Sequence, residues 1–162
     1  MDVQLDFYKS EYETLLKNYH LPPEQQGYTS LPSEALLACE QDSERYPVVI
    51  LFQGQPVGFF VLHGWNGVKV YSENKDAILL RAYSVNQTLQ GKGIGKKSIA
   101  IVPRFIKEYF PEKRELILAV NHGNEVAQHL YLKAGFIDKG TRVMGKKGEQ
   151  LVLHMELQEI SF

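Results

Sequence analysis

The sequence predicts an α/β fold with a mixed sheet: a central, mostly antiparallel sheet that contains one parallel pair of strands and is flanked by helices. Three observations support this prediction. Apolar runs of strand length alternate with stretches patterned at helical spacing, in the order β-α-α-β-β-β-α-β-α-β-β. The apolar runs at residues 46–53 and 57–63 are joined by a short turn, which predicts an antiparallel hairpin. Residues 77–85, 93–109 and 116–120 have the patterns of strand, helix and strand, and such a crossover places two strands in parallel.

The N-terminal part is expected to contain one strand, two helices and a loop. Residues 2–7 alternate weakly and predict the first strand. Apolar side chains then recur at helical spacing, so residues 9–20 are predicted to form an amphipathic helix. A Leu-Pro-Pro sequence breaks this helix, and a loop continues to residue 31. Ser30 or Ser33 is expected to cap a second helix, which ends near Asp42.

The middle of the chain contains one ambiguous segment and one interrupted helix. Residues 64–76 are polar and contain Asn66-Gly67, the signal of a type I′ turn, so they predict a loop or a small hairpin. The helix at 93–109 carries Pro103 in its interior. This proline is expected to kink the helix or to remove one hydrogen bond.

The C-terminal part predicts one helix and two strands. Residues 124–134 are patterned as a helix that ends at Gly135, a favourable residue just beyond a helix C-terminus. The strands are expected at 136–144 and 150–157. Apolar and polar residues alternate along the second strand, so it is expected to bury only one face.

Size and composition exclude several classes of protein. A chain of 162 residues with 44% apolar and 23% charged residues predicts one globular domain over residues 1–162. A net charge of −1 gives no electrostatic reason to expect nucleic acid or an anionic membrane as partner. No apolar run reaches transmembrane length and no signal peptide is evident, so a cytoplasmic protein is expected. Cys39 is the single cysteine and excludes an internal disulfide, and the five histidines form no metal-binding pattern.

A glycine-rich stretch, Gln-Gly-Lys-Gly-Ile-Gly-Lys-Lys at residues 90–97, lies between a predicted strand and a predicted helix. This arrangement is typical of phosphate binding, because glycines admit the anion and the N–H groups of the first helical turn point at it. The dinucleotide motif G-x-G-x-x-G fails at Lys96, and the P-loop motif fails because Lys97 replaces Ser or Thr. The pattern Q/R-x-x-G-x-G/A fits Gln90, Gly93 and Gly95. The alternative is a tight turn whose glycines serve geometry alone.

A second motif follows the predicted strand at 116–120. It has the form N-x-x-A-x-x-L-Y-x-K-x-G-F and comprises Asn124, Ala127, Leu130, Tyr131, Lys133, Gly135 and Phe136. Together, the two motifs resemble those of the GNAT superfamily of acyl-CoA-dependent N-acetyltransferases. The resemblance covers residues 77–157 in detail. The layout of the first half is loosely similar to that of the bacterial spermine/spermidine acetyltransferases.

The resemblance implies acetyl-CoA as co-substrate and a GNAT-like fold. In this family the two parallel strands splay apart, and the pantetheine arm of CoA fills the gap. A backbone N–H near Val85 is then the expected donor to the thioester oxygen. The residues expected to bind the cofactor are Tyr83, Ser84, Val85, Gln90, Gly91, Lys92, Gly93, Ile94, Gly95, Lys96, Asn124 and Lys133.

Tyr131 is the catalytic residue that the resemblance implies, because a phenol can protonate the departing thiolate as a general acid. Helical spacing alone leaves open that Tyr131 merely packs on the sheet. The general base is not evident from the sequence. Arg81 is the only charged residue of the strand at 77–85, so the amine is expected to lose its proton through water or to an acid such as Glu34 or Glu73.

The expected acceptor is a small-molecule primary amine, with a polyamine as the first candidate. Tyr28, Glu34 and Arg81 are the candidate acceptor residues, and the acidic residues of the first half suit a cationic amine. An aminoglycoside, an amino acid or a protein N-terminus is the alternative acceptor, and a non-catalytic acyl-CoA-binding module is the alternative class. The oligomeric state, monomer or homodimer, stays open.

Overall fold

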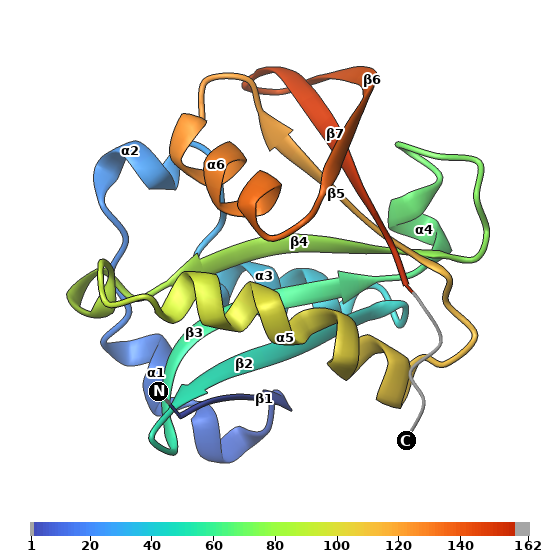
Figure 1. Ribbon diagram of the computed structural model, residues 1–162. Coiled ribbons are helices and arrows are strands. Elements are labelled where there is room, and N and C mark those ends of the chain that lie inside the picture. The colour runs from blue at the N-terminus through green and yellow to red at the C-terminus, as the bar shows by residue number, and fades with distance from the viewer. Residues whose placement is uncertain (1, 158–162) are drawn as a thin grey trace.

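A seven-stranded mixed sheet forms the centre of the computed structural model, which describes residues 2–157 (Figure 1). The predicted α/β fold is confirmed. The strand order is β1-β2-β3-β4-β5-β7-β6, and only β4 and β5 run parallel. The strands are β1 (Val3–Phe7), β2 (Arg45–Phe52), β3 (Gln55–His63), β4 (Ala77–Val85), β5 (Glu115–Asn121), β6 (Ile137–Gly145) and β7 (Gly148–Glu156).

Helices cover both faces of the sheet. The long helix α5 (Ile94–Tyr109) and the shorter α6 (Glu125–Lys133) pack on one face, with Ile99, Val102 and Ile106 of α5 fully buried there. The opposite face is covered by α1 (Thr14–Lys17), α3 (Pro32–Glu40) and α4 (Trp65–Val68). Three short elements complete the chain: the 3-10 helices η1 (Ser10–Tyr12) and η2 (Gln87–Leu89), and α2 (Pro23–Gln26). In the described part of the chain, no helix combines the length and apolar character needed to cross a membrane.

The parallel strands β4 and β5 pair over only part of their length. Residues 77–80 of β4 pair with residues 115–118 of β5, and the strands then separate (Figure 1). A β-bulge causes β4 to turn away: its register with β3 shifts between Phe59 and Val61, and Ala82 adopts a left-handed backbone with φ of +55°. The result is a V-shaped opening between the C-terminal halves of β4 and β5.

The N-terminal helices differ from the prediction. The single helix expected at residues 9–20 is divided into η1 and α1, and the expected loop before residue 31 contains α2. Neither Ser30 nor Ser33 caps α3. Its N-cap is Leu31, because Pro32 fits the first helical position and the Glu34 carboxylate accepts the Leu31 N–H at 3.2 Å.

Two other local predictions differ from the structure. Residues 64–76, expected as a loop or a small hairpin, begin with the helical turn α4 and continue as a loop. In this turn Gly67 passes so close over the His63 ring that a Cβ there would clash. Strand β7 is not buried on one face only: Leu151, Val152 and Leu153 are all buried, because β7 lies between β5 and β6 inside the sheet. Helix α5 continues through Pro103, which has no N–H to donate within the helix.

Candidate functional site

The opening between β4 and β5 is the point at which most predicted cofactor residues meet. The start of α5 lies on one side of it, and α6 lies on the other (Figure 1). The segment around α2 approaches both sides. Gln25 contacts the glycine-rich loop, and a Cβ on Gly123, in the turn before α6, would lie only 2.8 Å from the Tyr28 hydroxyl. The site is therefore bounded by three segments that are distant in sequence.

The glycine-rich loop has the backbone that the phosphate-binding motif requires. Gly91 and Gly93 adopt φ of +79° and +82°, conformations that side chains other than glycine rarely allow. Gly93 is the N-cap of α5, and the first helical bond runs from the Lys97 N–H to the Gly93 carbonyl at 3.1 Å. The N–H groups of Ile94, Gly95 and Lys96 therefore have no acceptor within the helix and point out of its positive end.

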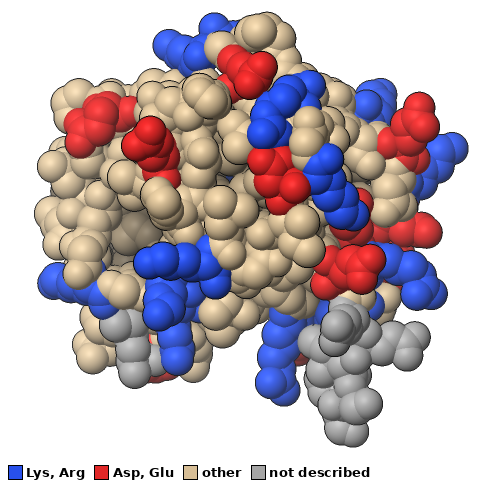
Figure 2. All heavy atoms as spheres, turned by 45° about the horizontal axis from the view of Figure 1, so that its top comes forward, with Lys and Arg blue, Asp and Glu red and all other residues tan. Residues whose placement is uncertain are grey.

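Positive side chains surround this loop. Lys92, Lys96 and Lys97 are all exposed. Figure 2 shows Lys and Arg atoms gathered at the side of the molecule where α5 begins, next to a hollow in the surface. Ile94 points the other way and is buried in the core, which anchors the first turn of the helix. Free N–H groups, a helix N-terminus and several lysines together can bind a phosphate group.

Gln90 holds the loop in place through its side chain. Its amide donates to the Val85 carbonyl at 2.7 Å and exchanges two hydrogen bonds with the amide of Gln25. Both hydrogen-bonding groups of the Gln90 side chain are thereby occupied. Gln25 was missed by the sequence analysis, because nothing in the surrounding loop sequence indicates that its partner lies in the glycine-rich stretch.

Tyr131 of α6 lies inside the molecule, in the core on the face of the sheet that α5 and α6 cover. The residue is 8% exposed, and its ring packs edge-on against Tyr83 and Phe136, with centroid separations of 6.2 and 5.8 Å. No other described residue forms a hydrogen bond with its hydroxyl group. Burial raises the pKa of Tyr131 well above its usual value, so the phenol carries its proton at neutral pH.

The Tyr83 and Ser84 side chains are engaged within the protein. The Tyr83 hydroxyl forms a 2.6 Å hydrogen bond with Ser98 of α5, and burial raises the pKa of Tyr83 to about 12. The Ser84 hydroxyl forms a 2.6 Å hydrogen bond with Tyr19, just beyond α1. These two side chains are therefore not free to bind a ligand, and the carbonyls of Tyr83 and Val85 already accept from Thr29 and Gln90. Neither Ser98 nor Tyr19 was anticipated from the sequence.

The two remaining predicted cofactor residues lie at opposite ends of α6. Asn124 is the N-cap, and its side chain accepts the Ala127 N–H at 3.3 Å. Lys133 is exposed in the last turn, where a cation interacts favourably with the helix dipole.

The predicted acceptor residues do not form one cluster. Tyr28 is 43% exposed and borders the opening at Gly123. Glu34 is exposed at the start of α3, where its carboxylate serves as a cap. Arg81 lies on β4 directly before the bulge, and its guanidinium donates to His63 Nδ1 at 3.2 Å. Tyr28 and Arg81 thus belong to two separate places near the opening, and Glu34 belongs to the surface.

The glycine-rich loop follows the part of β4 that no longer pairs with β5, and the Tyr131 phenol contacts the same part through Tyr83. Beyond Leu80 and Leu118 the two strands are not paired with each other. Such a site can bind a phosphate-containing thioester and supply one proton to a leaving group.

Comparisons with known proteins agree with this chemistry. Residues 10–136 match the acetyltransferase (GNAT) family. The uncharacterized N-acetyltransferase YbbJ of Bacillus subtilis strain 168 is 46% identical to this chain over 154 residues, which are 94% of this chain and 96% of YbbJ.

Solved structures share the fold at low sequence identity. A structure of AAC(6′)-Ib with paromomycin and acetyl-CoA has a TM-score of 0.75 and 17% identity, and covers 96% of this chain and 94% of its own. The spermidine N-acetyltransferase of Vibrio cholerae with CoA and spermine has a TM-score of 0.69, 15% identity, and coverage of 96% and 95%. The ribosomal-protein-S5-alanine acetyltransferase of Vibrio fischeri has a TM-score of 0.70, 14% identity, and coverage of 97% and 94%.

The prediction of an acetyl-CoA-dependent N-acetyltransferase is confirmed at the level of the family. Two signature motifs, the separated parallel strands and the family match over most of the length lead to the same assignment. The chain belongs to the GNAT family of acetyltransferases, with acetyl-CoA as its co-substrate.

Proposed function

We propose that this protein moves the acetyl group of acetyl-CoA directly to a primary amine of a small molecule. The observation that carries the proposal is the position of the Tyr131 hydroxyl. The residue is buried, and its protonated hydroxyl forms no hydrogen bond with any other residue of the described range 2–157. Its ring contacts Tyr83 on the strand that leads to the glycine-rich loop. We further propose that residues 1–162 act as one domain.

Cofactor binding is assigned to the backbone of the glycine-rich loop. The N–H groups of Ile94, Gly95 and Lys96 would bind the pyrophosphate, and Lys92 and Lys96 would add charge. Gln90 acts indirectly, because its side chain already binds Val85 and Gln25. The arm of the co-substrate would then lie along the unpaired part of β4, where a backbone N–H near Val85 would polarise the thioester carbonyl.

Tyr131 would act as general acid. The amine nitrogen attacks the thioester carbon, the C–S bond breaks, and the thiolate takes the phenolic proton of Tyr131. A phenol is protonated at neutral pH with or without a raised pKa, so this proton is present before the reaction. Water reprotonates the tyrosinate, and the acetylated nitrogen releases its extra proton to solvent. No carboxylate of β4 is available as a base, and Glu34 and Glu73 are exposed, so we assign the deprotonation of the amine to water.

The proteins of similar fold are named for, or bound to, chemically different amines. They include a spermidine N-acetyltransferase bound to spermine and AAC(6′)-Ib bound to paromomycin. A polyamine remains a candidate for this chain, although the charge around Arg81 does not favour it. A non-catalytic acyl-CoA-binding module is disfavoured by the free Tyr131 hydroxyl.

Release of free thiol from acetyl-CoA tests the proposal. The purified protein is incubated with acetyl-CoA and a panel of polyamines, aminoglycosides, amino acids and amino-carboxylates. We expect release that depends on both protein and amine, together with acetyl-CoA binding by calorimetry. Acetyl-CoA binding without amine-dependent release across the panel would favour the non-catalytic module.

A further inference from the structure

Arg81 carries a positive charge that the protein does not neutralise. The residue is largely buried on the face of β4 that α3 and α4 cover, and its side chain donates to the His63 ring. Among residues 2–157, no carboxylate lies within salt-bridge distance of its guanidinium group. A buried cation normally has an anionic partner, because desolvation is costly otherwise. Within residues 2–157, Arg81 therefore lacks the anionic partner that a buried cation normally has.

Asp42, the carboxylate whose charge acts on Arg81, is already occupied. Its Oδ1 accepts the Glu44 N–H at 3.0 Å and the Asn66 side-chain amide at 3.2 Å. Its Oδ2 lies 2.8 Å from His63 Nε2 and 3.6 Å from Arg45 Nε. These hydrogen bonds, that of the Glu44 N–H foremost, lower the pKa of Asp42 to about 2, so it stays ionised. One carboxylate thus faces two guanidinium groups.

His63 cannot supply the missing charge. Its buried ring has a lowered pKa, first through burial and then through Arg45 and Arg81. Since Arg81 can only donate, Nδ1 must be the acceptor and Nε2 must carry the hydrogen that Asp42 accepts. His63 is therefore neutral, and the cluster of Asp42, His63, Arg45 and Arg81 keeps a net positive charge.

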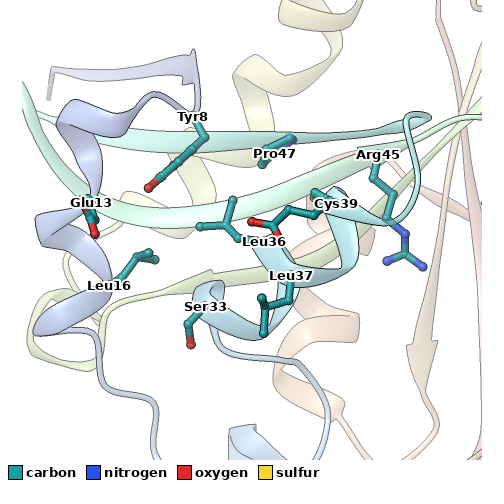
Figure 3. A pocket seen from close by; sticks show the side chains of 10 residues that line it. Tyr8, Glu13, Leu16, Ser33, Leu36, Leu37, Cys39, Arg45 and Pro47 are labelled. Carbon is teal, nitrogen blue, oxygen red and sulfur yellow. The ribbon is translucent and has the colours of Figure 1, made fainter.

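The cluster precedes the proposed thioester position along β4. Arg81 directly follows Leu80, the last residue of β4 that pairs with β5, and directly precedes the bulge at Ala82. Val85 lies four residues further on, roughly 13 Å along an extended strand. Arg45 lies at the end of a groove of about 620 Å³ between α1 and α3 (Figure 3). The positive charge of this cluster thus lies on the face of the sheet that α1 and α3 cover. An acceptor that reaches from the thioester position to this charge must span several bonds.

We infer that Arg81, supported by Arg45, binds an anionic group of the acceptor, which is an amine bearing a carboxylate or phosphate several bonds from the reacting nitrogen. This inference rests on the proposed acetyl transfer and names its substrate class. Arg81 keeps N–H donors that His63 does not use, and a guanidinium group pairs well with either oxyanion. A polyamine would place cationic nitrogens against the same charge.

Matched amine pairs test the inference on the unaltered protein. Thiol release is measured with ω-amino carboxylates of increasing chain length and with their carboxamides, and with phosphoethanolamine against ethanolamine. Spermidine is assayed in parallel as a cationic acceptor. We expect kcat/KM for the best anionic member to exceed that of its neutral partner by about ten-fold or more. Equal values, or a preference for spermidine, would overturn the inference and leave acetyl transfer intact; no release with any amine would reject the proposed function.

Substitution of Arg81 localises the effect. In Arg81→Gln, the preference for the anionic member should fall towards one, while the KM for acetyl-CoA changes little. Arg104→Gln on the exposed side of α5 is the matched control and should keep the preference. An anionic preference that survives in folded Arg81→Gln would contradict the assignment. If Arg81→Gln does not fold, the inference is judged by the ratio of kcat/KM for the anionic amine to that for its neutral partner, measured on the unaltered protein.

Discussion

Gln25 and Gln90 exchange two side-chain hydrogen bonds, of 3.1 and 3.0 Å, although 65 residues separate them. Gln25 belongs to α2, which borders the opening, and Gln90 belongs to the glycine-rich loop. The pair therefore fixes the loop to the N-terminal segment, and the amide of Gln90 continues the link to the Val85 carbonyl. Through this link, a change in α2 can alter cofactor binding without contacting the cofactor.

Gln25→Ala should weaken acetyl-CoA binding several-fold and lower stability by about 1–2 kcal/mol, because two neutral hydrogen bonds are lost. Calorimetry and urea unfolding measure the two effects. Glu24→Ala, an exposed change in the same helix, is the control and should alter neither. Unchanged affinity in Gln25→Ala would mean that the loop keeps its conformation without this link.

Gly93→Asp should abolish acetyl-CoA binding, because it places a carboxylate where we expect the pyrophosphate. The substitution also strains a left-handed residue, so its control must share the backbone conformation. Gly54→Asp does so, with φ of +78° against +82° at Gly93, in the turn between β2 and β3. Binding lost in Gly93→Asp and kept in Gly54→Asp is the expected calorimetric result. If both variants bind acetyl-CoA equally well, the glycine-rich loop is not the phosphate-binding site.

Gly123→Ala should raise the KM for the amine acceptor with little effect on the KM for acetyl-CoA. A Cβ at this position would lie 2.8 Å from the Tyr28 hydroxyl and 3.3 Å from Asn121 Oδ1, so the Tyr28 side chain must move. Tyr28→Phe combined with Gly123→Ala should recover part of the loss, since the colliding oxygen is gone. Steady-state kinetics at saturating acetyl-CoA provide the measurement. If the acceptor KM is unchanged in Gly123→Ala, Tyr28 does not contribute to acceptor binding.

Stability should fall as the pH drops below about 6.5, in part through His63. Burial lowers the pKa of folded His63, so between its unfolded and folded values the unfolded chain binds more protons than the folded one. Above the pKa of His63 in the unfolded chain, the protein keeps its full stability. As the pH falls from that value to the lower pKa of His63 in the folded protein, the free energy of unfolding decreases by up to about 1.4 kcal/mol per pH unit. His63→Gln should flatten this slope in urea unfolding, whereas the same change at exposed His129 should not. A slope unaffected by His63→Gln would contradict the assignment.

The sequence predicted the strands of the sheet well because their signals are local. The apolar run of β4 and the amphipathic pattern of α5 each determine an element without help from distant residues. The motif around Tyr131 likewise predicted α6, and Asn124, the first residue of that motif, is its N-cap.

Predictions failed where a distant contact decides the structure. Strand β7 is more fully buried than its alternating pattern predicts because it pairs between β5 and β6. The Gln25–Gln90 pair and the Arg81–His63 contact join residues whose relationship exists only after folding. The charge at Arg81 was visible in the sequence, but the lack of a carboxylate beside it was not.

The acid role of Tyr131 is tested most directly by Tyr131→Phe, assayed for amine-dependent thiol release at saturating acetyl-CoA. The substitution keeps the ring that packs against Tyr83 and Phe136 and removes only the hydroxyl group. Because general acid catalysis contributes about 10²- to 10⁴-fold, kcat should fall at least about ten-fold, with acetyl-CoA affinity and thermal midpoint nearly unchanged. Tyr109→Phe, an exposed change on α5, should keep full activity. A Tyr131→Phe enzyme with the kcat of the unaltered protein would contradict the proposed mechanism and leave Tyr131 as a packing residue.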